Sequence, residues 1–157
     1  MAISGEQEFT TEVEAPIQVC FATIMDFEKY PKWFSSIEHA RVLERHADGR
    51  GKVVEFSIDM KLKSIRYVLE YDYEEPTGLT WKSVDGDVES ITGAYVFEKV
   101  NAKQSRVTCR QAVSLGFWLP GPIRKLLEGQ ALKQSVLEFK AAAEDAAKGA
   151  ARRRARK

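Results

Sequence analysis

The sequence predicts an α+β fold in which a seven-stranded antiparallel sheet packs against a long C-terminal helix. Six runs with strand character follow one another between positions 36 and 115, and short turn-like clusters separate them. The longest helical pattern comes after the last of these runs. Strands joined by such short connections form antiparallel meanders. With 157 residues and 44% hydrophobic content, the chain can enclose one substantial core, so we expect a single domain.

The strands are predicted from alternation and from turn residues. The six runs span residues 36–45, 52–60, 64–73, 79–84, 88–100 and 106–115, and residues 7–13 can add a seventh strand. Within them, apolar side chains such as Val54 and Phe56 alternate with polar ones such as Glu55, which predicts one covered and one wet face. Asp85-Gly86 predicts a hairpin turn, because both residues can adopt positive φ.

Two short helices are predicted between the first and second strands. Pro16 fits a first helical turn, and apolar residues recur at helical spacing over 17–25. The stretch DFEKYPKW (26–33) follows, and its proline ends that helix or turns it toward a second short helix at 32–35. We interpret this stretch as a corner, because it contains no obvious catalyst.

The long helix is predicted to begin after Leu119-Pro-Gly-Pro122 and to be interrupted by Gly129. Its expected apolar side comprises Ile123, Leu126, Leu127, Gln130, Leu137 and Ala141. Beyond Ala146 the segment KGAARRRARK has no apolar face, so we expect the domain to span 1–147 and a basic, disordered tail to span 148–157.

The charge is divided unevenly along the chain. The formal net charge is +1, but the tail holds six cations and no acid, so residues 1–147 carry 18 cations against 23 acids. The cations Arg152, Arg153, Arg154, Arg156 and Lys157 either stay solvated or contact an anionic membrane or RNA. No signal peptide and no apolar run of the ~20 residues needed to span a membrane is seen, so we expect a cytoplasmic protein.

Motifs for catalysis and for cofactors are missing from the sequence. Cys20 and Cys109 have no metal-ligand spacing and are interpreted as buried free thiols. His39 and His46 are expected to face solvent, in a strand and in a turn. There is no HExxH, P-loop, GxGxxG or GxSxG stretch, so we expect no metal, no cofactor and no catalytic residue.

Several segments together resemble a known superfamily. DFEKYPKW followed by FSSIEHARVLE, then LTW (79–81), TGAYVFEKV (92–100), SRVTCR (105–110) and a proline-flanked start of the last helix is similar to the START-like (SRPBCC) superfamily, in its polyketide cyclase/dehydrase and coenzyme-Q-binding branch. The resemblance covers roughly residues 6–145. It implies a helix-grip fold, in which the curved sheet wraps around the C-terminal helix and leaves a cavity between them.

The resemblance also implies which residues would bind a ligand. The expected lining of the cavity and its mouth is Trp33, Phe34, Ile58, Met60, Tyr67, Leu69, Tyr71, Trp81, Tyr95, Phe97, Gln111, Phe117, Trp118, Leu126, Leu127 and Gln130. The density of aromatic side chains with polar tips favours a cavity over a dry core. We therefore expect the protein to bind or carry a hydrophobic or aromatic small molecule, such as a quinone, isoprenoid, lipid or polyketide.

Two other functions stay open from the sequence. One is an aromatase/cyclase acting on a polyketide-like substrate, with templating and hydrogen bonding in place of a buried acid or base. The other is an interaction protein that associates with ribosomes or membranes through the basic tail. The acidic body argues against RNA binding. Oligomeric state is not predicted.

Overall fold

Seven antiparallel strands form one sheet in the order β1-β7-β6-β5-β4-β3-β2. The computed structural model of the chain describes residues 6–59, 64–114, 116, 118, 120–122 and 131–155. The strands are β1 (Gln7–Val13), β2 (Ile37–Arg45), β3 (Gly51–Asp59), β4 (Ser64–Glu74), β5 (Gly78–Gly86), β6 (Ser90–Asn101) and β7 (Gln104–Ser114). The predicted α+β class, the strand count and the meander are confirmed.

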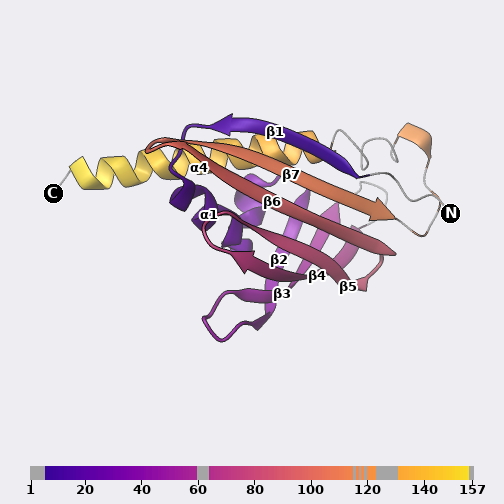
Figure 1. The fold of residues 1–157 in the computed structure, drawn as a ribbon. Helices are drawn as coiled ribbons and strands as arrows, with labels where there is room; N and C mark the ends of the chain where they lie inside the picture. Colours follow the sequence, from indigo (N-terminus) through magenta and orange to yellow (C-terminus); the bar gives the residue numbers. More distant parts are fainter. Residues whose placement is uncertain are drawn as a thin grey trace.

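The first strand lies at one edge of the sheet and pairs with the last one, from Gln7 opposite Gln111 to Val13 opposite Ser105. The long helix α4 (Ala131–Ala155) runs beside this edge, as Figure 1 shows. Lys140 Nζ donates to the Glu12 carbonyl at 2.9 Å, and the Glu14 amide donates to Glu144 Oε2 at 2.9 Å. Side chains of α4 therefore form hydrogen bonds with backbone groups near the end of β1, one within the strand and one just after it.

The segment between β1 and β2 builds a helical corner. It consists of α1 (Ile17–Met25), a single 3₁₀ turn η1 (Phe27–Lys29) and α2 (Tyr30–Trp33). The two predicted short helices are thus confirmed, but the second begins at Tyr30 rather than Lys32. Pro31 lies in its first turn, where its missing N–H costs nothing, so the proline starts this helix instead of preceding it.

Helix α4 buries a different side from the predicted one. Its buried residues include Leu132, Val136, Phe139 and Ala143, whereas Leu137 is 42% exposed and Ala141 is exposed. The prediction continued one apolar stripe across Gly129, but the spacing from Leu132 onward defines its own buried face. The remaining predicted members of the stripe, residues 123–130, lie outside the described part of the chain.

Helix α4 also extends farther than predicted. It continues to Ala155, through residues expected to be disordered beyond Ala146. Alanine and arginine have high helix propensity, so a helix can form here without an apolar face. Figure 1 shows the C-terminal part of α4 projecting past the strands. In the described ranges, no helix has both the length and the apolar character required to cross a membrane.

The hairpin between β5 and β6 turns later than predicted. Gly86 is the last residue of β5 and lies opposite Tyr67, with φ of +114°. A Cβ on Gly86 would lie 2.6 Å from Tyr67 Cα, so glycine is required at this position. The register shifts between Val68 and Leu69, which adds one residue to β5. Asp85-Gly86 therefore ends a bulged strand, and residues 87–89 make the turn.

Candidate functional site

A continuous group of aromatic side chains lies between the inner face of the sheet, the helical corner and α4. We call it the aromatic cluster; it comprises Tyr30, Trp33, Phe34, Phe56, Tyr67, Tyr71, Trp81, Tyr95, Phe97 and Phe139. Neighbouring rings are in contact throughout: Phe56 stacks on Tyr67 with 5.3 Å between centroids, and Tyr95 lies 5.3 Å from Phe139. Alternate side chains along the strands thus form the covered face that the sequence predicts.

Trp81 lies across the middle of this face. It is opposite Gly93 in the neighbouring strand, and a Cβ on Gly93 would be 2.4 Å from Trp81 Cζ2. The indole Nε1 donates to Gln111 Oε1 on β7 at 3.2 Å. The missing side chain of Gly93 is therefore what allows Trp81 to reach from β5 across β6 to β7.

The tyrosine hydroxyls of the interior differ in their partners. Tyr30 donates to the Ile24 carbonyl, and Tyr73, at the far end of β4, donates to the Gly51 carbonyl. The hydroxyl of Tyr95 lies beside Cys109 and Ser135, both of which affect its pKa. Within the described part of the chain, the hydroxyls of Tyr67 and Tyr71 have no hydrogen-bond partner.

Burial keeps these phenols protonated. It raises the pKa of Tyr67, and it raises the pKa values of Tyr71 and Tyr95 well above the ordinary range. A phenol with a raised pKa is a hydrogen-bond donor at neutral pH and not a base. Tyr67 is nevertheless only half-buried, so part of its surface stays accessible beside the cluster.

Among the described residues, no charged side chain is buried beside Tyr67, Tyr71 or Tyr95. Besides tyrosine, the buried polar side chains of the described ranges are Ser105 and Ser135. Ser105 Oγ donates to the Ala15 carbonyl and Ser135 Oγ donates to the Leu132 carbonyl, both at 2.8 Å. Burial raises the pKa of Cys20 to about 11 and that of Cys109 to about 12, so neither is a reactive thiolate. The site can donate hydrogen bonds and stack, but it offers no buried acid or base among the residues described.

The structure brings together ten of the predicted ligand-binding residues. Leu69, Tyr71, Trp81, Tyr95 and Phe97 are buried, while Trp33, Phe34, Ile58, Tyr67 and Gln111 are half-buried around them. Trp118 does not join them, because it is 78% exposed. Met60, Phe117, Leu126, Leu127 and Gln130 lie outside the described residues.

Four members of this environment were missed by the sequence analysis: Tyr30, Phe56, Ser135 and Phe139. Phe139 contacts Trp33, Tyr95 and Phe97, with ring centroids 5.3 to 6.0 Å apart. The four-residue spacing from Ser135 through Phe139 to Ala143 carries the signal for this face. Phe56 alternates with Ile58 in β3, so the strand pattern carries the signal for this residue.

The two histidines have different environments. His39 is exposed, as predicted. His46 is half-buried, contrary to the prediction: its Nε2 lies 2.8 Å from the Tyr71 carbonyl, and its ring is 5.8 Å from that of Tyr73. The turn that contains it folds back on β4, so His46 supports the end of that strand. No group of three metal-ligating side chains occurs among the described residues.

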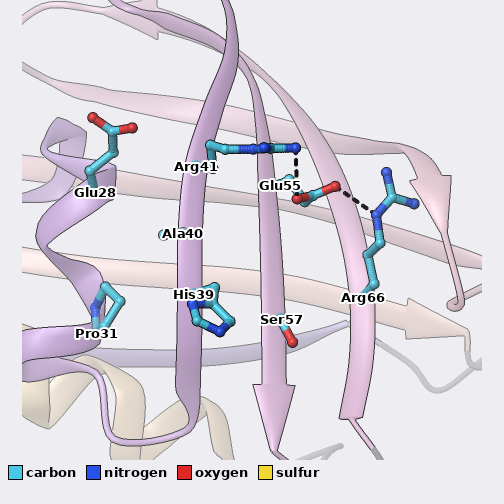
Figure 2. A pocket seen from close by; sticks show the side chains of 8 residues that line it. All are labelled: Glu28, Pro31, His39, Ala40, Arg41, Glu55, Ser57 and Arg66. Carbon is cyan, nitrogen blue, oxygen red and sulfur yellow. Dashed lines mark hydrogen bonds and ion pairs between the residues drawn. The ribbon is translucent and has the colours of Figure 1, made fainter.

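A hollow of about 590 Å³ lies on the outer face of the sheet, beside the helical corner (Figure 2). Its lining consists of Glu28, Pro31, His39, Ala40, Arg41, Glu55, Ser57 and Arg66. Glu55 Oε1 is 3.4 Å from Arg41 Nη2, and Glu55 Oε2 is 2.7 Å from Arg66 Nε. Figure 2 shows both arginines turned toward this carboxylate. The charges pair with one another across the strands, so we assign no ligand to this hollow.

Comparison with solved structures supports the fold. The chain is similar to a START superfamily protein from Mycobacterium smegmatis, with 19% identity, coverage of 92% of this chain and 97% of the other, and a TM-score of 0.75. Similar values describe TTHA0849 from Thermus thermophilus: 19% identity, 92% and 98% coverage, and a TM-score of 0.74. The Zhui aromatase/cyclase from Streptomyces sp. R1128 is 18% identical over 96% and 94% of the two chains, with a TM-score of 0.66.

These identities show the fold and not the activity. Comparison with the curated proteins gives no match. A family model described as "Polyketide cyclase / dehydrase and lipid transport" matches residues 13–140, which include the helical corner, strands β2 to β7 and the part of α4 that carries Phe139. The protein therefore belongs to the polyketide cyclase/dehydrase and lipid transport family.

Proposed function

We propose that the protein binds a neutral, hydrophobic or aromatic small molecule between the sheet and α4, in contact with the aromatic cluster. The observation that carries this proposal is the pair of hydroxyls on Tyr67 and Tyr71, which have no partner among the described residues. Tyr71 is buried, and a buried hydroxyl without a partner costs roughly 1–3 kcal/mol, while Tyr67 lies half-buried on the same strand. A ligand oxygen that accepts from these phenols would remove that cost.

The inventory of the site supports a ligand of defined chemistry. The half-buried rings of Trp33 and Tyr67 favour a planar or apolar partner that can stack on them. Phenols that stay protonated favour an accepting oxygen, such as a carbonyl or ether. In the described ranges, no buried charge is available to compensate a carboxylate or phosphate. Quinones, polyketide-like ketones and isoprenoids therefore fit better than free fatty acids.

Removing the two hydroxyls tests the proposal. Titration of protein fluorescence and native mass spectrometry would measure binding of a quinone, a polycyclic ketone, an isoprenoid alcohol and a fatty acid. We expect Tyr67→Phe and Tyr71→Phe each to weaken binding about 5-fold, which corresponds to one net hydrogen bond. Tyr73→Phe is the matched control on the same strand, because its hydroxyl already donates to Gly51. Equal affinities for all three variants, or no binding of any compound, would overturn the proposal.

Cyclisation of a polyketide-like substrate is the second candidate function. It is supported by the family of the chain and by the donor-only interior, which can hold and polarise a carbonyl without transferring a proton. Turnover of a poly-β-ketone would separate it from carriage. Loss of product in Tyr67→Phe, Tyr71→Phe and Tyr95→Phe with binding retained would establish catalysis, whereas unchanged product would leave the tyrosines as packing groups.

A further inference from the structure

The C-terminal part of α4 is a basic helix that projects from an acidic body. Ala143 is fully buried and Ala147 still packs against the core, but Lys148, Arg152 and Arg153 are exposed. We call residues 148–155 the basic extension. It contains only lysine, arginine, alanine and glycine, whereas residues 1–147 carry 18 cations against 23 acids. Figure 1 shows this end of α4 beyond the strands.

The described cations of the extension, Lys148, Arg152 and Arg153, are not neutralised by the body. Among the described residues, no carboxylate forms an ion pair with Lys148, Arg152 or Arg153. Lys148 acts on Glu144 only at longer range, where it helps to lower the pKa of that carboxyl. Glu144 forms its ion pair with Lys140 instead. Charged side chains that are exposed and not held in ion pairs are available to an anionic surface.

Helical geometry presents these charges together. Residues four positions apart lie on the same side of a helix, so Lys148 and Arg152 form one row, with Arg153 beside it. Within this row, Arg152 Nε donates to the Lys148 carbonyl at 3.4 Å. The extension is about 10 Å long at 1.5 Å per residue, which is comparable to the Debye length of ~8 Å at physiological salt. Its outer end is therefore screened from the negative charge of the body.

We propose that the basic extension docks the protein on an anionic lipid bilayer. The extension offers several cations on a smooth surface of alanine and glycine, which suits a plane of phosphate headgroups. It has no aromatic side chain for stacking on bases and no amide or hydroxyl side chain for reading them, so RNA is matched less well. It also has no large apolar side chain for insertion. Docking is consequently electrostatic and reversible by salt.

Co-sedimentation of the full chain with vesicles tests this proposal. We expect binding to phosphatidylcholine vesicles containing roughly one-third phosphatidylserine, no binding to pure phosphatidylcholine, and release by added salt. Each cation that is removed should lower the affinity for the vesicles about fivefold. The triple variant Lys148→Gln/Arg152→Gln/Arg153→Gln should therefore bind on the order of 100-fold more weakly. Circular dichroism would verify that α4 is retained.

A matched control separates the extension from overall charge. Lys99→Gln/Lys103→Gln/Arg110→Gln removes the same charge from exposed positions on the body and should leave vesicle binding within about twofold of the unmodified chain. Equal losses in the two triple variants would overturn the proposal. Tighter binding to a single-stranded RNA homopolymer than to the anionic vesicles, measured at the same ionic strength, would also overturn it. Binding of the small-molecule ligand does not enter either measurement.

Discussion

Replacing Gly93 by alanine tests how Trp81 packs within the aromatic cluster. A Cβ at this position would lie 2.4 Å from Trp81 Cζ2, 2.5 Å from Trp81 Cε2 and 2.7 Å from the Arg110 carbonyl. The Arg110 carbonyl belongs to the neighbouring strand β7 and cannot shift by itself, so the Trp81 indole must move away from residue 93. Overpacking of this kind costs roughly 1–3 kcal/mol. Loss of the Trp81–Gln111 hydrogen bond adds about 1 kcal/mol.

We therefore expect Gly93→Ala to lower the free energy of unfolding by about 2–4 kcal/mol and Tm by roughly 5–15 °C. Urea denaturation, followed by tryptophan fluorescence and circular dichroism, would measure it. Gly149→Ala is the control: nothing lies within 4 Å of a Cβ there, and alanine in the helix should raise stability by up to about 1 kcal/mol.

A second substitution at Trp81 sharpens the test. Leucine lacks the two indole atoms that approach Gly93, so Gly93→Ala should cost much less in a Trp81→Leu background than in the unmodified protein. An unchanged denaturation midpoint for Gly93→Ala, or equal costs in the two backgrounds, would refute the packing described for Trp81.

Two further predictions concern pH. Because burial raises the pKa values of Tyr30, Tyr67 and Tyr71, the folded state holds protons that the unfolded state loses above about pH 10. The free energy of unfolding should therefore stay constant below that pH and fall as pH rises above it. Tyrosinate absorbance should appear together with unfolding. Tyrosinate formed in full before the far-ultraviolet circular dichroism changes would contradict this. Burial opposes ionisation of Glu144, but hydrogen bonds from Lys140 and the Glu14 amide outweigh burial and lower the pKa of this carboxyl. Glu144→Ala should therefore lower the free energy of unfolding by less than about 1 kcal/mol near neutral pH, and this difference should shrink in acid. Urea midpoints would measure it, with Asp145→Ala as the control. A difference that grows on acidification would show that the carboxylate does not fasten β1 to α4.

Strand positions were predictable because turn residues and alternation report directly on a half-buried sheet. The same alternation placed Tyr67, Tyr71 and Trp81 on the inner face. The predicted turn after β5 comes too early, because Gly86, with its positive φ, is still paired with Tyr67 at the end of a bulged strand. Local sequence cannot distinguish these two uses of glycine.

The face and the length of α4 were harder to predict. The face depends on helical phase, and a small error in phase places Leu137 on the buried side in place of Phe139, whereas the structure exposes Leu137 and buries Phe139. The helix exceeds its predicted length because alanine and arginine after Ala146 favour a helix even without an apolar face. The partners of the tyrosine hydroxyls could not be predicted at all, since they depend on tertiary contacts such as that between Tyr73 and Gly51.

The pairing of β1 with β7 imposes an order on folding. Gln7 meets Gln111 and Val13 meets Ser105, so the first strand has no partner until most of the chain has been synthesised. The hairpins from β2 to β7 involve neighbours in sequence and can form earlier. Closing so long a loop is entropically slow, which predicts folding on the slow side for a domain of this size. Until that closure, Phe9 and the other inward residues of β1 stay open to chaperones or to aggregation.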